Sequence, residues 1–504
     1  MSWPQINDEE YNKSIHCAPS TYLVLLLIIA AFTRIPFAIH GFGESDSARI
    51  LITAIDSVKY NVLREYQTDV VPGYTAIVTY LLRIFGNDYN AVMLSMNYLN
   101  VFLGICIVIP SYYYIYSITK NGIVSFYTTL MFIFAPAVWQ ASTYGFPSLI
   151  SLFFLTTSLW SFASFYDTES KRRYIWLAVS LCCIFLLFII KADILLNIGA
   201  FLGTATIKGN GRKNALFALI FIAASCLGCL LLRGLLFGVS DSAQSGSING
   251  VLSYITLFKH VKGQSYYTTH FQPILYGTGI ATIIVFILSI VPNYIHNKKY
   301  LLLCVLWIGP PTIFWSLLSE NTARHNMASV LPEVLLVVLV VSLIASKVSA
   351  KKYILSGSIL MLIAASIFTT KPSTNFISPS GNIIKSSKMY TDQSARFATN
   401  IENLLILQKS KICFLGGWEN PFVIYEILKN SKSYRVERLK EWDHYRIDMT
   451  AKNGKNYTWM IIYPRGATKE EGIQNALIQY KDYNLSDYLI VTSASGAEIQ
   501  TKHL

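Results

Sequence analysis

Charged side chains are scarce in this sequence, where Asp, Glu, Lys and Arg together make up 14% of the residues. Soluble domains carry about 25%. Hydrophobic residues make up 53%, and the mean hydropathy is +0.43. This balance excludes an ordinary soluble protein and indicates a membrane protein. The formal net charge of +13 does not indicate a nucleic-acid partner, because most of the excess lies in short loops between apolar runs, where Lys and Arg set orientation.

The eight cysteines lack the spacing of a disulfide framework or a metal site. Six of them lie inside apolar runs, where cysteine behaves as a small hydrophobic residue. Cys226 and Cys229 form a C-x-x-C without a partner pair, and Cys413 stands alone in the polar tail. The first apolar run, at residues 21–39, is not followed by a small-x-small cleavage site. We therefore expect this run to be a membrane span and not a cleaved signal peptide.

Eleven apolar runs are long enough to cross a hydrocarbon core of about 30 Å. A further run at residues 71–85 is short and contains Pro72, Gly73 and Arg83. If that run does not cross, the basic loops between later spans all face the cytoplasm, as the positive-inside rule requires. We therefore predict an interfacial helix there. The spans begin near Thr21, Ala91, Ile123, Phe146, Tyr174, Ile194, Asn214, Phe271, Leu301, Ala328 and Tyr353.

The predicted organisation is a polytopic α-helical membrane domain at residues 1–370 and a soluble extracytoplasmic α/β domain at 371–504. In the tail, strand patterns at 412–415, 459–463 and 488–492 alternate with helical patterns at 422–429 and 469–480. The external loop at residues 41–70 follows the first span, and we expect it to carry the active site.

An acidic segment opens this external loop. Glu44 and Asp46 lie where an external helix meets the membrane, and Arg49 follows about one turn later. A carboxylate in this position can act as a general base toward an acceptor hydroxyl. The alternative is an acidic side chain that only favours the helix N-terminus.

Basic residues also lie near the predicted outward ends of spans, where the orientation rule predicts few. Arg34, Lys191, Arg233 and Arg324 are of this kind. Any one of them can reach a lipid headgroup, but four on one side indicate a pocket for phosphate or pyrophosphate. His325 and Lys259 are further candidates for phosphate contact, although Lys259 also fits a solvated loop. Tyr74 and Tyr144 are candidates for contact with a sugar or acceptor.

A base and a phosphate-binding cluster at the outer leaflet describe one type of reaction. The base deprotonates an acceptor, the acceptor attacks the anomeric carbon of a sugar carried on polyprenyl phosphate, and the cations stabilise the departing phosphate. Attack opposite the leaving group predicts inversion at that carbon.

The sequence resembles the GT-C superfamily of glycosyltransferases that use polyprenyl-phosphate sugars, in the branch of protein O-mannosyltransferases and lipid A aminoarabinose transferases. Asp46-Ser-Ala-Arg49 matches the D-x-A-R motif of the first external loop in that branch. Three further similarities follow in order over residues 20–346. They are the Pro-led helix from Val71-Pro-Gly-Tyr74 to Phe85-Gly86, the basic residue in Lys191-Ala-Asp193, and Arg324 ahead of Leu331-Pro332.

The resemblance implies roles for individual residues. Asp46 would be the base, Glu44 a second carboxylate, and Arg49 the residue that orients the base. Lys191 and Arg324 would hold the donor phosphate. The turn at residues 139–147 has no carboxylate where related oligosaccharyltransferases carry metal ligands, so we expect metal-independent chemistry without a cofactor. The segment Val71-Pro72-Gly73 departs from the basic residue and Pro-Pro pair that family members often have.

Two other functions compete with this one. An O-antigen polymerase or ligase usually has a large external loop rich in Arg and His, and the loop at residues 240–270 has only modest basic content. A lipid-linked sugar flippase or transporter predicts internal repeats and charged residues near the middle of spans, and neither a clear repeat nor a mid-span acidic residue is evident. The expected partners are the lipid bilayer, a polyprenyl-phosphate sugar and a glycan, lipid or protein acceptor. The expected location is a bacterial inner membrane with the tail in the periplasm, and an endoplasmic reticulum placement is the alternative.

Overall fold

The structure is a computed structural model, and it describes the chain in two compact units. One unit, the helical unit, comprises residues 1–38 and 98–383; the other, the mixed unit, comprises 39–97 and 384–504. The predicted domain boundary at residue 370 lies outside the described residues. These are 19–42, 45–61, 63, 73–86, 88–209, 212–237, 272–317, 325–347, 351–369 and six strands between 411 and 502.

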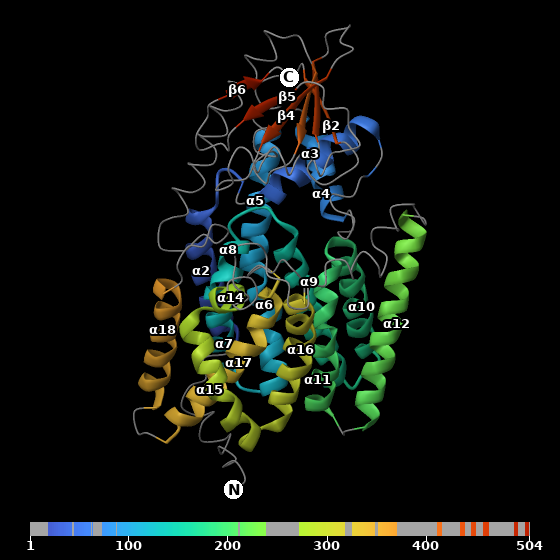
Figure 1. The fold of residues 1–504 in the computed structure, drawn as a ribbon. Coiled ribbons are helices and arrows are strands. Elements are labelled where there is room, and N and C mark those ends of the chain that lie inside the picture. Colours follow the sequence, from blue (N-terminus) through green and yellow to red (C-terminus); the bar gives the residue numbers. More distant parts are fainter. Residues whose placement is uncertain are drawn as a thin grey trace. The chain divides into compact units, whose positions relative to one another are not determined.

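Helices account for every predicted span (Figure 1). Among the described residues, seven helical stretches are long and apolar enough to cross a membrane. They are Ser20–Phe37, Tyr89–Thr119, Pro147–Asp167, Arg173–Ile190, Lys213–Leu232, Lys298–Ser316 and Met327–Ala345. The other four predicted spans coincide with the shorter apolar helices Gly122–Phe134, Leu195–Lys208, Ile280–His296 and Tyr353–Ile367. The chain is an integral membrane protein.

Two contacts of helix α2 (Pro19–Arg34) show its direction relative to α7 (Gly122–Phe134). Near the start of both helices, the rings of Tyr22 and Phe126 lie 5.4 Å apart. At their far ends, Arg34 donates to the backbone oxygen of Ile133. The two helices therefore run parallel, which requires an odd number of crossings between them. The continuous pair α5 (Tyr89–Cys106) and α6 (Val108–Thr119) is long and apolar enough to make one crossing, and the interfacial position of residues 71–85 stays a prediction.

Close helix packing in the helical unit depends on two glycines one turn apart. Gly199 and Gly203 begin α11 (Gly199–Lys208) with the G-x-x-x-G spacing that lets membrane helices approach closely. A Cβ atom on Gly199 would lie 2.2 Å from the backbone oxygen of Leu306, and one on Gly203 would lie 2.7 Å from the Cα of Leu303. Helix α11 can therefore pack against α16 (Lys298–Leu317) only with glycine at these positions.

The remaining helices of this unit are α8 (Pro136–Ala141), α9 (Pro147–Asp167), α10 (Arg173–Ile190), α12 (Arg212–Phe237), α14 (Gln272–Thr278), α15 (Ile280–His296), α17 (Val330–Ala345) and α18 (Lys351–Thr369). Short 3-10 helices lie at Ile35–Phe37, Ala192–Ile198 and Met327–Ser329. Helix α17 is buried over most of its length, in keeping with its nearly uniform apolar sequence.

The mixed unit contains two helices that follow the first span. Helix α3 (Ser45–Tyr60) packs against α4 (Gly73–Phe85). The buried apolar residues of the two helices include Ala48, Leu51, Ile52, Val78 and Leu82. Helix α4 also has exposed apolar side chains at Tyr80, Ile84 and Phe85. A helix with apolar residues on both its packed side and its exposed side fits the predicted interfacial position.

A six-stranded sheet completes the mixed unit, in the order β2-β3-β1-β4-β5-β6. Strands β1 (Lys411–Leu415), β4 (Tyr457–Ile462) and β5 (Tyr488–Val491) are parallel neighbours, and these are the three strands predicted from the sequence. Three antiparallel strands flank them: β2 (Tyr434–Arg438), β3 (Tyr445–Met449) and β6 (Ile499–Lys502). Parallel pairs require crossover connections; the predicted helices at 422–429 and 469–480 lie outside the described residues.

Candidate functional site

The carboxylate of Asp46 is buried in the first turn of α3. Its residue is 2% exposed, and Arg49, one turn later, is 3% exposed. Arg49 Nη1 lies 3.5 Å from Asp46 Oδ1, so the two side chains form an ion pair with i, i+3 spacing. The helical spacing that suggested an interaction in the sequence therefore does bring these two residues together. The arrangement fixes the carboxylate at the N-terminus of a helix, where negative charge is favoured.

An asparagine of α5 holds the segment that leads into this helix turn. Asn97 Nδ2 donates to the backbone oxygens of Ile39 at 2.5 Å and Gly41 at 2.8 Å. Asn97 is buried. The backbone ahead of Asp46 is therefore fixed by an amide in an otherwise apolar stretch. Glu44, the predicted second carboxylate, lies outside the described residues.

In the helical unit, Arg34 is a fully buried cation at the end of α2. Its Nη1 donates to Thr33 Oγ1 at 2.7 Å, and its Nη2 donates to the backbone oxygen of Ile133. Trp139 Nε1 donates to the backbone oxygen of Thr33 at 3.1 Å. Among the described residues Arg34 makes no ion pair. Its charge is held by neutral oxygens.

Lys191 lies at the same end of the helical unit, between α10 and α11. The residue is 6% exposed, and its Nζ lies 6.0 Å from the centroid of the Phe146 ring, at the outer limit of a cation–π contact. Asn100 Nδ2 donates to the backbone oxygens of Tyr144 at 2.7 Å and Phe146 at 2.8 Å, which fixes the turn that carries this ring. We call the region formed by Arg34, Trp139, Phe146 and Lys191 the Lys191 end of the helical unit.

The other predicted phosphate contacts are placed only in part. Arg324 and Lys259 lie outside the described residues, and so does the side chain of Arg233 in α12. His325 is described, and its ring stacks on Trp315 with centroids 3.8 Å apart and planes 9° apart. The contribution of each of these residues to phosphate binding stays a prediction.

The two tyrosines predicted to contact sugar or acceptor are both buried. Tyr74 is 2% exposed and Tyr144 is 3% exposed. Burial raises the pKa of the Tyr74 phenol, so this group stays a neutral hydroxyl. Neither ring presents an open face to solvent, and contact with a sugar by either one stays a prediction.

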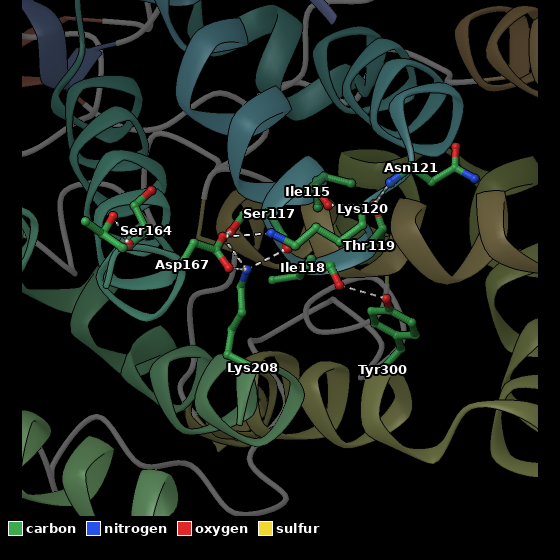
Figure 2. A network of polar contacts seen from close by, with 11 residues as sticks. Ile115, Ser117, Ile118, Thr119, Lys120, Asn121, Ser164, Asp167, Lys208 and Tyr300 are labelled. Carbon is green, nitrogen blue, oxygen red and sulfur yellow. Dashed lines mark hydrogen bonds and ion pairs between the residues drawn. The ribbon is translucent and has the colours of Figure 1, made fainter. Parts of the chain in front are cut away.

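A charged network that no local sequence pattern indicates lies at the opposite end of the helical unit. Lys208 Nζ contacts Asp167 Oδ1 at 2.7 Å and Oδ2 at 2.6 Å, and it donates to the backbone oxygen of Ser117 at 2.6 Å. Lys120 Nζ lies 3.0 Å from Asp167 Oδ2. Figure 2 shows both ammonium groups converging on this carboxylate. We call this region the Lys208 end.

The network joins the ends of three helices, α6, α9 and α11, so the basic segments that follow these helices lie at one end of the helical unit. Their location on the cytoplasmic side, which follows from the positive-inside rule, stays a prediction.

One buried acidic residue has no place in the predicted site. Glu333 lies in the first turn of α17, near one end of that helix, and is 3% exposed. Thr278 Oγ1 donates to Glu333 Oε2 at 2.6 Å. In the sequence, Glu333 stands out as an acidic residue that follows a proline inside an apolar run. Its hydrogen-bond partner could not be predicted, because Thr278 is 55 residues away.

Solved structures with the same arrangement of helices include the apo crystal structure of the oligosaccharyltransferase from Archaeoglobus fulgidus. Its TM-score is 0.52 at 13% sequence identity, over 82% of this chain and 64% of that chain. ArnT from Cupriavidus metallidurans bound to undecaprenyl phosphate gives a TM-score of 0.47 at 11% identity, over 81% and 75%. AglB from Archaeoglobus fulgidus in complex with an inhibitory peptide and a dolichol-phosphate gives 0.46 at 13%, over 76% and 58%.

No family model and no curated protein matches the sequence. The structural likeness to the oligosaccharyltransferase confirms the predicted fold, a GT-C-like polytopic helical membrane domain. The chain spans 64% of the length of that protein. At such low identity the likeness establishes the architecture, and the chemistry has to be argued from the residues of this chain.

Proposed function

We propose that this chain is an inverting, metal-independent membrane glycosyltransferase that moves a sugar from a polyprenyl-phosphate donor to a glycan, lipid or protein acceptor of the cell envelope. The observation that carries the proposal is the buried carboxylate of Asp46, ion-paired with Arg49 at the N-terminus of α3. A carboxylate buried at the start of a helix outside the spans is suited to proton transfer in a site that excludes water.

In this mechanism Asp46 is the general base. One carboxylate oxygen takes the proton of an acceptor hydroxyl while the acceptor oxygen forms a bond to the anomeric carbon. The bond from that carbon to the phosphate oxygen breaks, and the electron pair leaves with the polyprenyl phosphate. Arg49 positions the carboxylate, and Glu44 is a second acidic group in the same loop.

The charge that develops on the departing phosphate needs cations. Arg34 at the Lys191 end supports such a role, because it is buried and held by neutral oxygens. Lys191 at the same end adds a second buried cation, and we propose Arg324, Arg233, His325 and Lys259 as further contacts. Arginine offers a planar pair of donors to phosphate, and lysine offers a point charge.

The ligands named for the similar solved structures are consistent with this donor. One is bound to undecaprenyl phosphate and another to a dolichol-phosphate. We propose that the site faces the extracytoplasmic side of a bacterial inner membrane, with the tail domain in the periplasm. Cysteine labelling at Ser170 and Ser495 tests this orientation. The two positions should be reached from opposite sides, and labelling of both from outside would contradict the proposed span count.

A transporter or flippase of lipid-linked sugars is the second candidate, and Glu333 is the observation that favours it. Buried acidic residues within spans are typical of transport pathways. A flippase moves lipid-linked sugar across reconstituted vesicles without breaking the bond between sugar and phosphate. Intact donor recovered after translocation would therefore favour this candidate.

The direct test of the transferase uses purified protein, radiolabelled polyprenyl-phosphate sugars and acceptors extracted from membranes. Asp46→Asn should lower the rate of transfer by a factor on the order of 10²–10⁴, the usual contribution of a general base. Asp88→Asn is the matched control, because Asp88 is an exposed carboxylate of the same unit that caps α5 through Ala91, and asparagine caps helices equally well. Equal transfer by wild type and Asp46→Asn removes Asp46 from the mechanism.

A further inference from the structure

A cleft of about 400 Å³ lies between α3 and α4, wholly within the mixed unit. Its volume is within the range of about 300–1,000 Å³ that is typical of small-molecule sites. It is separate from the first turn of α3. The lining residues are Ser57, Asn61, Leu63, Ala76, Thr79, Tyr80 and Arg83.

A buried polar stripe on α3 runs from Asp46 to this cleft. Asp46, Arg49, Thr53 and Ser57 follow one another at helical spacing, and each is 3% exposed or less. Ser57 lies eleven residues after Asp46, which is about three helical turns and about 16 Å along the axis. The two side chains therefore lie on nearly the same face of α3. Polar groups on a buried helix face are unusual unless they serve a ligand or a network.

The chemical groups in the cleft are complementary to an acidic sugar. Arg83 Nη2 donates to Asn61 Oδ1 at 3.2 Å, which orients the guanidinium group. Asn61 lies just beyond the end of α3 and has a left-handed φ of +50°, a backbone conformation that asparagine tolerates. Arginine retains further donors for a carboxylate or phosphate.

Hydroxyl groups and an aromatic ring complete the lining. Ser57 Oγ donates to the backbone oxygen of Thr53 at 2.8 Å, and Thr79 Oγ1 donates to that of Thr75 at 2.7 Å. The Thr79 oxygen can therefore act as an acceptor for a sugar hydroxyl. Tyr80 is 65% exposed and adds an apolar ring with a polar tip.

We infer that this cleft binds an acidic sugar, a ring that carries a phosphate or a carboxylate group, with Arg83 pairing with the anion. The assignment of this sugar to the acceptor rests on the proposed function. At about 16 Å from Asp46 along α3, the bound sugar is not the one that reacts. It is a more distant unit of the acceptor glycan, and the cleft selects acceptors that carry it.

The binding test uses the purified full-length protein and needs no donor. Glucose 6-phosphate, glucuronate, glucose and inorganic phosphate are titrated separately, with isothermal titration calorimetry as the readout. At least one of the two acidic sugars should bind about tenfold or more tightly than glucose and than inorganic phosphate, and which one binds identifies the anion. Arg83→Ala should weaken that binding at least tenfold, and Arg83→Lys should weaken it less, because lysine keeps the charge and loses the paired donors.

Two controls separate this inference from the transferase mechanism. Arg172→Ala removes an exposed arginine of the helical unit and should leave binding unchanged. Asp46→Asn should bind the acidic sugar as the wild type does, even where transfer is lost. In the transfer assay, Arg83→Ala should raise the KM for the acceptor and leave kcat unchanged.

Three results would overturn the inference. Glucose that binds as tightly as both acidic sugars removes the role of the anion. Inorganic phosphate that binds as tightly as the sugars reduces the cleft to a plain anion site. If Arg83→Ala binds the acidic sugar as tightly as wild type, and its thermal unfolding shows that it is folded, the cleft is not the binding site. None of these results bears on Asp46 as the base.

Discussion

The two ends of the helical unit hold their buried cations in different ways. At the Lys208 end, the Lys208 ammonium group lies within 2.7 Å of both oxygens of Asp167, so the protein supplies its own counter-charge. At the Lys191 end, Arg34 is fully buried and donates to a hydroxyl and a backbone carbonyl. Both ends lie in the same unit, and each contains a buried cation.

This difference separates a structural role from a functional one. A buried cation that a carboxylate of the protein already neutralises has little charge left for a ligand. A buried cation held by neutral oxygens keeps its charge, and its desolvation remains costly until an anion arrives. The Lys191 end is therefore the end at which we propose that a lipid phosphate binds, and the Lys208 end holds helices together.

The largest expected effect is the loss of donor use when charge is removed at the Lys191 end. Arg34→Gln keeps hydrogen-bond donors for the neutral oxygens but removes the charge, so kcat/KM for the polyprenyl-phosphate sugar should fall on the order of 100-fold. Lys191→Gln should act in the same direction. Initial rates of transfer at varied donor concentration measure both effects.

A charge-keeping variant is the matched control for this prediction. Arg34→Lys should retain more activity than Arg34→Gln, because it keeps a cation in the same place. Thermal unfolding in detergent should show that the two variants are similarly stable. If Arg34→Gln transfers sugar as fast as wild type, the proposed contrast between the ends fails.

The second expected effect is a loss of stability at the Lys208 end. Asp167→Asn leaves the buried ammonium of Lys208 without its carboxylate and should lower the free energy of unfolding by about 2 kcal/mol. This is below the usual 3–5 kcal/mol for a buried pair, because a third of the Asp167 side chain is exposed. Denaturant or thermal unfolding measures it, and transfer per folded molecule should not change. A loss of transfer without a loss of stability would reverse the roles of the two ends.

The sequence predicts most of this fold because its strongest signals are local. Apolar length located the seven described helices that are long enough to cross a membrane and four shorter apolar helices. The position of the basic loops predicts that residues 71–85 do not cross. The parallel strands β1, β4 and β5 were found from their apolar runs. Strands β2 and β3 were missed because charged residues such as Arg435, Glu437 and Arg446 interrupt the apolar pattern, and β6 is short and polar.

The candidate site was predictable only where its residues are close in sequence. Asp46 and Arg49 are one turn apart, so a helix was enough to pair them. Asp167 and Lys208 are 41 residues apart, and the Glu333–Thr278 contact spans 55 residues, so both depend on helix packing that no local pattern encodes. Asn97 and Asn100 were visible as amides in an apolar run, but the backbone oxygens they bind were not.

A third prediction tests whether the Lys208 pair is one unit. Lys208→Met together with Asp167→Asn should be less destabilised than the sum of the two single variants, by about 1–2 kcal/mol. The reason is that the double variant leaves no unpaired buried charge. A double-mutant cycle of unfolding free energies measures this coupling. Strict additivity would mean that the close contact between the two side chains contributes nothing.

The smallest expected effect comes from the second lysine of the same network. Lys120 lies 3.0 Å from Asp167 but 62% of its side chain is exposed, so water screens the pair. Lys120→Gln should change the free energy of unfolding by about 0.5 kcal/mol or less. A loss as large as that of Asp167→Asn would show that exposure does not distinguish the two lysines.

The most direct test of the mechanism is the configuration of the new glycosidic bond. Purified protein is given a donor of known anomeric configuration, and the product is examined by NMR through the coupling constant of its anomeric proton. A single carboxylate acting as base, with attack opposite the departing phosphate, predicts a product whose anomeric carbon is inverted relative to the donor. A product that retains the configuration of the donor would contradict this account of Asp46.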